Sequence, residues 1–258
     1  MLPSADPTVV GVVALVLFVA GATNGLAGFG FALVGTMALA TMVPPATAVV
    51  FMIVPIFAVN LSLVSELSVA QLRTCSQRFG PLIAAALVGT VVGMVALTSV
   101  PTAPLRIALG VLTLGFVLTA QRRVEVPVQS GGDLAKSTPG MVGVGAVSGL
   151  VFGGTNVGVQ LIAYLRSFDL SHGLFVGVVA LVFLGLNGLR VGVAGALGLY
   201  PSAAVAGASV LAALPAVVGV AAGTQLRVAA SEGARRFVVL TLLTVVGIRL
   251  VAGGLGLA

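Results

Sequence analysis

The sequence is poor in charge and in residues that bind metals. Only 7% of its 258 residues are charged, against about 25% in soluble domains. It has one Cys, one His and no Trp. A single Cys excludes an intramolecular disulfide, and one Cys with one His leaves a zinc or iron site short of ligands. We therefore expect no cofactor, no metal centre and no enzyme.

Most of the sequence is apolar. Hydrophobic residues make up 59% of it, and apolar runs of about 20 residues, long enough to span a bilayer as a helix, recur throughout. This pattern predicts an all-α polytopic protein embedded in the lipid bilayer. The 12 basic residues are scattered singly or in pairs, so they indicate membrane orientation rather than binding to nucleic acid.

A polar linker divides the chain. Residues 121–138 separate a first membrane repeat at 1–120 from a second at 139–258. In each half we expect a glycine-broken segment followed by three transmembrane helices. The expected ranges are roughly 8–43 (broken), 46–66, 77–98 and 103–120, then 139–166 (broken), 171–198, 202–225 and 234–256.

The two halves resemble each other in sequence. The stretch "GATNGL" at 21–26 matches "GAVSGL" at 145–150, a shift of 124 residues. The stretch "PLIAAALVGT" at 81–90 matches "PAVVGVAAGT" at 215–224, a shift of 134 residues. Shifts that drift while the order is preserved are expected after a duplication followed by changes in loop length.

The basic residues distinguish two topologies. If each broken segment crosses the membrane once, the loop charges divide five to five between the two sides. If each broken segment is a hairpin that returns to its own side, the division is nine to one, with Arg106 alone opposite the others. The positive-inside rule favours the second division. The nine are Arg73, Arg78, Arg122, Arg123, Lys136, Arg166, Arg227, Arg235 and Arg236.

The hairpin topology makes the halves inverted repeats, an arrangement found in many secondary transporters. Both termini are then extracytoplasmic and the central linker is cytoplasmic, in a multi-pass protein of the cell membrane. The arms of the first hairpin, of about 14 apolar residues each, are short for a full crossing. The sequence leaves open whether the hairpins cross fully or re-enter.

The broken segments carry the candidate binding residues. Irregular backbone inside a bilayer is tolerated only where protein covers it or where it lines a wet cavity, and helix N-termini that end there favour anions. Close helix packing is the alternative explanation for the glycines. The polar residues beside them favour an anion site between the two segments near the bilayer midplane. Its candidates are Thr23, Asn24, Gly28, Gly30, Ser148, Gly153, Gly154, Thr155, Asn156 and Gln160.

Three further polar residues lie within expected spans. Asn60 and Asn187 occupy matching helices, where either substrate contact or an interhelical hydrogen bond would explain them. Arg190 follows Asn187 by three residues and so lies on the same helix face. Its planar guanidinium suits an oxyanion, although the side chain could instead extend to the outer interface. We include all three in the predicted substrate site.

The two glycine-rich segments, "GLAGFG" at 25–30 and "GLVFGG" at 149–154, are similar to the repeated signature of the TauE/SafE family. The resemblance covers nearly the whole chain in order and spacing. It implies export of sulfite, organosulfonates or related small anions across the cytoplasmic membrane. The usual G-x-G-G-G run is altered in both halves, which bears on the substrate more than on the fold.

The sequence therefore predicts a transporter that exports a small anionic substrate such as sulfite or an organosulfonate. Every Asp and Glu falls in a loop or at the end of an expected helix, so proton or sodium coupling through a buried carboxylate is disfavoured. The alternatives are a carrier or channel for another small solute, and a membrane assembly subunit without transport activity. The sequence leaves open a homodimer.

Overall fold

The structure is a computed structural model that describes residues 7–27, 30–64, 69–121, 137–168, 170, 172–226 and 231–257. Residues 122–136 of the predicted linker lie outside these ranges. All elements in the described ranges are α-helices: α1 Pro7–Ala27, α2 Phe31–Met42, α3 Pro45–Phe51, α4 Ile53–Val64, α5 Val69–Leu97, α6 Thr102–Gln121, α8 Thr138–Thr155, α9 Val159–Arg166, α10 His172–Ala196, α11 Ala203–Leu211, α12 Ala213–Leu226 and α13 Glu232–Gly254.

The helices confirm the predicted all-α membrane protein. Within the described residues, five helices are long and apolar enough to cross a bilayer. They are Pro7–Leu26, Arg78–Leu97, Thr102–Gln121, Ala203–Leu226 and Gly233–Gly254. α5 begins about eight residues before the expected start of its apolar run, because a helix can continue through polar residues beyond the bilayer.

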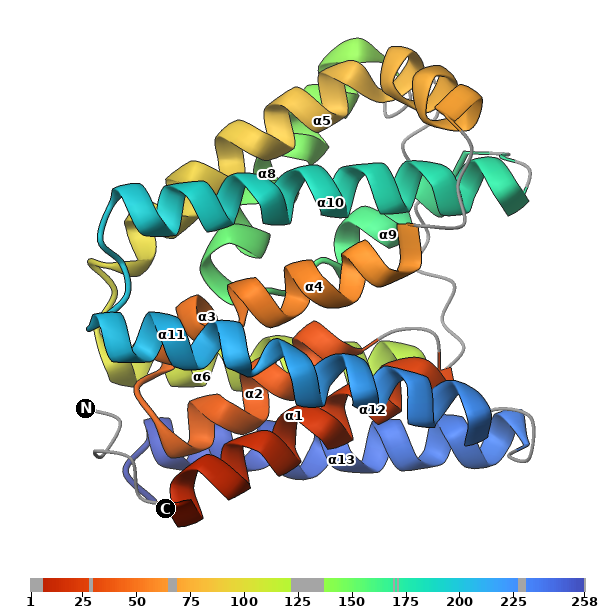
Figure 1. Cartoon of the computed structure of the whole chain (residues 1–258). Helices are drawn as coiled ribbons and strands as arrows, with labels where there is room; N and C mark the ends of the chain where they lie inside the picture. The colour runs from red at the N-terminus through yellow and green to blue at the C-terminus, as the bar shows by residue number, and fades with distance from the viewer. Residues whose placement is uncertain are drawn as a thin grey trace. The chain divides into compact units, whose positions relative to one another are not determined.

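The chain forms two compact units, each of which combines helices from both halves of the sequence. Unit 1 comprises residues 1–59, 100–123 and 198–258, and unit 2 comprises residues 60–99 and 124–197. Unit 1 therefore contains α1, α2, α3, α6, α11, α12 and α13, and unit 2 contains α5, α8, α9 and α10 (Figure 1).

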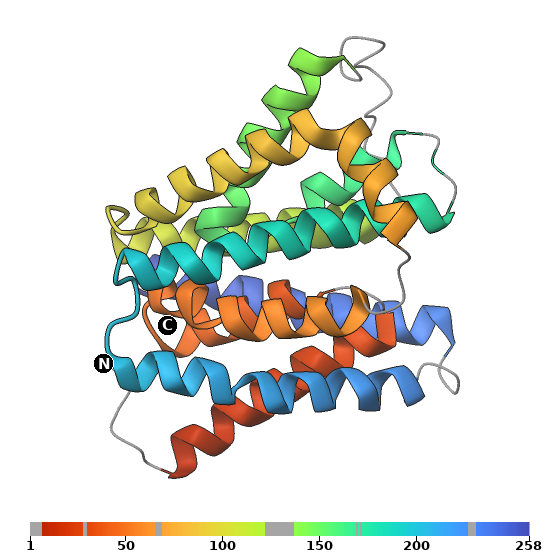
Figure 2. The same ribbon diagram turned by 45° about the horizontal axis from the view of Figure 1, so that its top comes forward.

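In unit 1, α1 and α12 run parallel and in close contact (Figures 1 and 2). A Cβ atom on Gly21 would overlap the carbonyl of Ala216, and one on Gly25 would overlap the carbonyl of Val220. Glycines of α12 meet the backbone of α1 in the same way. The two helices can approach this closely because no side chain separates their backbones.

A second pair in unit 1, α6 and α13, runs antiparallel. Gly110 of α6 lies against Gly247 of α13. Gly254, seven residues further along α13, lies against Ala103 near the start of α6, so the two helices run in opposite directions. The two ends of the pair carry different basic residues. Arg106 lies near Gly253 at one end, and Arg236 donates to the carbonyl of Ala120 at the other.

Unit 2 is built on a pair that corresponds to α1 and α12 under the sequence repeat. α5 and α8 run parallel, and Cβ atoms on Gly149 and Gly153 would overlap the carbonyls of Ala86 and Thr90. The Thr90 hydroxyl also donates to the carbonyl of Gly149, at 3.2 Å. In each unit, therefore, the first arm of one broken segment packs against the second of the three spans that follow the broken segment in the other half.

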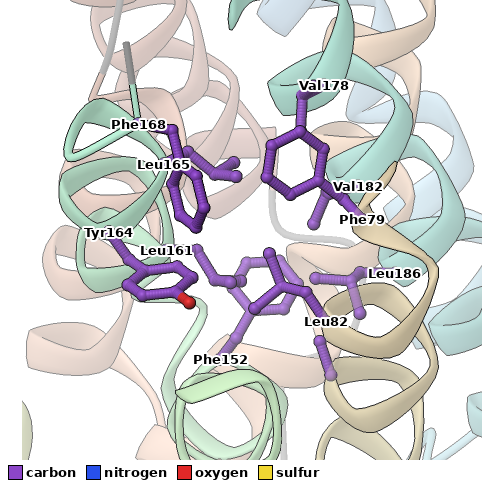
Figure 3. Close-up of a cluster of buried hydrophobic side chains, with 11 residues drawn as sticks. Phe79, Leu82, Phe152, Leu161, Tyr164, Leu165, Phe168, Val178, Val182 and Leu186 are labelled. Atoms are coloured by element: carbon purple, nitrogen blue, oxygen red, sulfur yellow. The ribbon is translucent and has the colours of Figure 1, made fainter. Parts of the chain in front are cut away.

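Aromatic and aliphatic side chains fill the core of unit 2 (Figure 3). Phe79 of α5 and Tyr164 of α9 both meet Phe168 edge to face, with ring centroids 5.2 Å apart. Phe152 of α8 and Leu186 of α10 belong to the same cluster. α8, α9 and α10 therefore pack against one another through this core, beside the break between α8 and α9.

In the structure, the interval between the two helices of each broken segment is shorter than the sequence predicted. The sequence prediction interrupted the helices at their glycines, but Gly21 and Gly25 lie inside a continuous α1, and Gly149 and Gly153 lie inside a continuous α8. Close packing against a neighbouring helix explains these glycines. The first arm is accordingly a helix of 21 residues rather than about 14. α1 ends at Ala27 and α2 begins at Phe31, and α8 ends at Thr155 and α9 begins at Val159.

Two of the remaining helices end four residues before a proline. α3 ends at Phe51 ahead of Pro55, and α11 ends at Leu211 ahead of Pro215. Proline has no N–H and displaces the carbonyl four residues earlier, which must find another donor in a membrane. For Phe51 that donor is the Ser209 hydroxyl of α11, at 2.6 Å.

Candidate functional site

The candidate site lies in unit 2, where α8 ends and α9 begins. Asn156 adopts a left-handed conformation (φ 63°), and its N–H bonds the carbonyl of Phe152 at 2.9 Å. Asn tolerates this conformation better than other residues with a side chain, so it can end a helix as glycine does. Gly158 then precedes the first turn of α9 without a capping side chain.

Arg190 reaches this break from α10. Its guanidinium donates to Oδ1 of Asn156 and lies over the ring of Phe152, 4.8 Å from the ring centroid. Arg190 and Asn156 are 0% and 1% exposed. Arg190 is therefore buried at the break, which excludes the alternative that it extends to the outer interface. Arg249, by contrast, is exposed on α13.

Further hydrogen bonds join the residues on either side of this break. Nε2 of Gln160 in α9 donates to the carbonyls of Val157 at 2.8 Å and Ser148 at 3.4 Å. The Thr155 hydroxyl donates to its own helix and accepts from the N–H of Val157, at 3.1 Å. Polar groups released by the break are thus satisfied locally, as irregular backbone inside a membrane requires.

Asn187 lies one turn before Arg190 on α10 and is fully buried. Its Nδ2 donates to the carbonyl of Phe183 at 2.8 Å, whereas no donor among the described residues bonds Oδ1. Rotating the amide would place Oδ1 against that carbonyl, so the assigned orientation is the favourable one. A buried acceptor without a donor is unusual and requires an explanation.

The first break, in unit 1, has a different set of contacts. Oδ1 of Asn24 accepts from the N–H of Phe31 at 3.3 Å, so a side chain of α1 caps the start of α2. Gly30, immediately before α2, has φ 107°, which favours glycine. Arg235 of α13 donates to the carbonyl of Leu26 at 3.3 Å. At the shift of 127 residues that relates Asn60 to Asn187, the residue that corresponds to Arg190 is the apolar Leu63.

The predicted site residues therefore fall into two groups. Unit 1 holds Thr23, Asn24 and Gly30, and Gly28 lies outside the described residues. In unit 2, the end of α8, the residues between α8 and α9, the start of α9 and the middle of α10 hold Ser148, Gly153, Gly154, Thr155, Asn156, Gln160, Asn187 and Arg190. Asn60, near the end of α4, is half-buried.

Comparison with known proteins identifies the family. The family model described as "Sulfite exporter TauE/SafE" matches residues 13–250. The chain belongs to the TauE/SafE family. Members of this family are membrane transporters of the sulfite and organosulfonate type, so the chain is a multi-pass membrane protein of that type. No curated protein and no solved structure matches it significantly.

In this TauE/SafE protein, the structure places two aromatic residues at the candidate site that the sequence analysis had not selected. Phe152 supports the guanidinium of Arg190, and its ring meets that of Phe183 edge to face at 5.4 Å. A Cβ atom on Gly158 would overlap the Phe183 ring, so this glycine is needed for close packing. Sequence analysis missed both Phe residues because an aromatic in an apolar run is indistinguishable from a core residue.

Proposed function

We propose that this protein exports a small oxyanion or organosulfonate and binds it at the break between α8 and α9. The observation that carries the proposal is the fully buried guanidinium of Arg190, which donates to Asn156 at the end of α8. A planar guanidinium binds sulfonate and sulfite oxygens through paired hydrogen bonds.

The charge of the surrounding helices supports an anionic substrate. None of α5, α8, α9 or α10 contains Asp or Glu, so the helices around the break carry no carboxylate that would repel an anion. A buried charge is costly inside a membrane and is by default a candidate for a functional site. A hydrogen bond to a charged group contributes about 1.5–3 kcal/mol, so each bond from the guanidinium to an anion would favour binding by about this amount.

The buried amide oxygen of Asn187 supports a preference of the transporter for substrates that carry a hydrogen-bond donor. Its buried Oδ1 lies one turn from Arg190 and can accept an O–H or N–H. Hydrogensulfite and 2-hydroxyethanesulfonate each combine a negative charge with such a donor. Ethanesulfonate, sulfate and chloride have none at neutral pH, which makes 2-hydroxyethanesulfonate and ethanesulfonate a matched pair of substrates.

Efflux from proteoliposomes tests the proposal. We expect saturable efflux of sulfite and of 2-hydroxyethanesulfonate, with ethanesulfonate several-fold slower and with sulfate and chloride near background. An inside-negative potential should accelerate efflux, because it contributes about 2.3 kcal/mol per charge per 100 mV towards anion exit. If folded, inserted protein transports none of these anions, the proposed function is wrong.

We also propose that both broken segments are hairpins and that the halves are inverted. Two plain crossings would make α6 and α13 parallel, whereas hairpins make them antiparallel, as they are in unit 1. Hairpins also separate Arg106 from Arg235 and Arg236, which lie at opposite ends of this helix pair.

Cysteine labelling tests this topology. In a Cys75→Ser background, single cysteines at Ser130 in the linker and at Ala258 should react with an impermeant reagent from opposite sides of the membrane. The linker should be cytoplasmic, as the positive-inside rule requires. Labelling of both sites from the same side would contradict the inverted arrangement.

A further inference from the structure

A groove of about 500 Å³ follows α13 at the end of unit 1 where α6 terminates. Its walls include Gln121 of α6 and, along α13, Arg236, Phe237, Leu240, Thr244 and Val245. Both helices are long and apolar enough to span the membrane. The groove therefore lies along two candidate membrane-spanning helices, and Phe237, one of its lining residues, is 71% exposed.

One end of the groove is cationic. Arg236 lies in the first turns of α13 and donates to the carbonyls of Ala120 and Gln121, the last residues of α6. The side chain is exposed, and a guanidinium offers five N–H donors, so the same group can also bind an external oxyanion. The N-terminus of α13 adds a partial positive charge at the same level.

The rest of the groove is apolar and long. The lining residues extend from Gly233 to Val245, a rise of about 18 Å along a helix. This length is close to half of the roughly 30 Å hydrocarbon core, the depth of one leaflet. Thr244, near the inner end, donates to the carbonyl of Leu240 in its own helix at 2.7 Å, so its hydroxyl is satisfied.

We propose that this groove binds an anionic phospholipid, with the phosphate at Arg236 and an acyl chain along Phe237, Leu240 and Val245. A soluble anion would match only the cationic end, whereas a phospholipid matches both the charge and the length. None of the residues that line the groove is acidic. Glu232, the one acidic residue of α13, lies one turn before Arg236, where the adjacent Arg235 offsets its charge. Cationic clefts between transmembrane helices commonly bind such lipids.

Native mass spectrometry of the purified full chain tests this. Wild type should retain phosphatidylglycerol in preference to phosphatidylcholine. Arg236→Gln should retain about five-fold less, the factor expected from one Arg beside an anionic lipid. Arg249→Gln, which removes an exposed Arg from the other end of α13, is the matched control and should retain the wild-type amount. Thr244→Trp should also reduce retention by filling the apolar part of the groove.

Three results would overturn the proposal. Equal retention by Arg236→Gln and wild type, with both proteins eluting as folded species, would exclude Arg236 as the headgroup site. Displacement of the lipid by millimolar inorganic phosphate would show that only an anion site exists. Disulfide-linked dimers of Phe237→Cys in a Cys75→Ser background, formed equally with and without phosphatidylglycerol, would show that a second copy covers the groove.

Discussion

Replacing Arg190 with Gln should reduce sulfite efflux at subsaturating concentration about ten- to a hundredfold. The estimate follows from losing a charge-assisted hydrogen bond of about 1.5–3 kcal/mol to the anion. Gln keeps much of the length of the side chain and can still meet Asn156, whose Oδ1 the guanidinium now contacts. Proteoliposomes with matched protein content give the measurement.

Two further variants separate binding from folding. Arg190→Lys keeps the positive charge but loses the planar fork, so we expect an intermediate rate. Arg249→Gln removes an arginine that is exposed on α13, and it should transport at the wild-type rate. Wild-type efflux by folded Arg190→Gln protein would make Arg190 a structural residue and would leave the substrate site unassigned.

Adding one methyl group at Gly149 should destabilise the protein by about 1–3 kcal/mol. The new Cβ of Gly149→Ala would overlap the carbonyl of Ala86, and a backbone atom cannot rotate away as a side chain can. α5 and α8 would have to separate, which would also stretch the hydrogen bond from Thr90 to the Gly149 carbonyl. Thermal unfolding in detergent measures the change.

Gly143→Ala is the matched control on the same helix. A Cβ atom at Gly143 meets no atom within 4 Å, so the substitution should only remove the conformational freedom of glycine. That change stabilises a helix by roughly 0.5–1 kcal/mol. The two variants should therefore shift the unfolding temperature in opposite directions. Equal shifts would mean that α5 and α8 do not pack through Gly149.

The helices could be predicted closely because each is an apolar run bounded by polar residues or proline. The span expected at 103–120 is α6, Thr102–Gln121, and the one expected at 234–256 is α13, Glu232–Gly254. The breaks could not be placed as well. In the sequence, a glycine such as Gly25 is equally consistent with a broken helix and with close packing against another helix. The residue it packs against, Val220, lies far away in the sequence.

The contacts within the candidate site could not be predicted for the same reason. Asn156 and Arg190 were both candidates, but their contact joins residues 34 positions apart across two helices. Nothing in either local sequence indicates it. The partner of the carbonyl that Pro55 displaces was equally hidden, because Ser209 is 158 residues from Phe51. Local patterns predict elements, whereas these partners depend on how the chain folds back on itself.

The glycine packing of α1 and α8 also bears on how substrate preference can diverge among relatives. The signature glycines Gly25, Gly149 and Gly153 each lie against the backbone of a neighbouring helix, so they specify the scaffold. A change of cargo can leave them untouched. Sorting relatives by the glycine signature would therefore group proteins by architecture rather than by substrate. The residues equivalent to Asn187 and Arg190, which we propose bind the substrate, are the better basis for subdividing them.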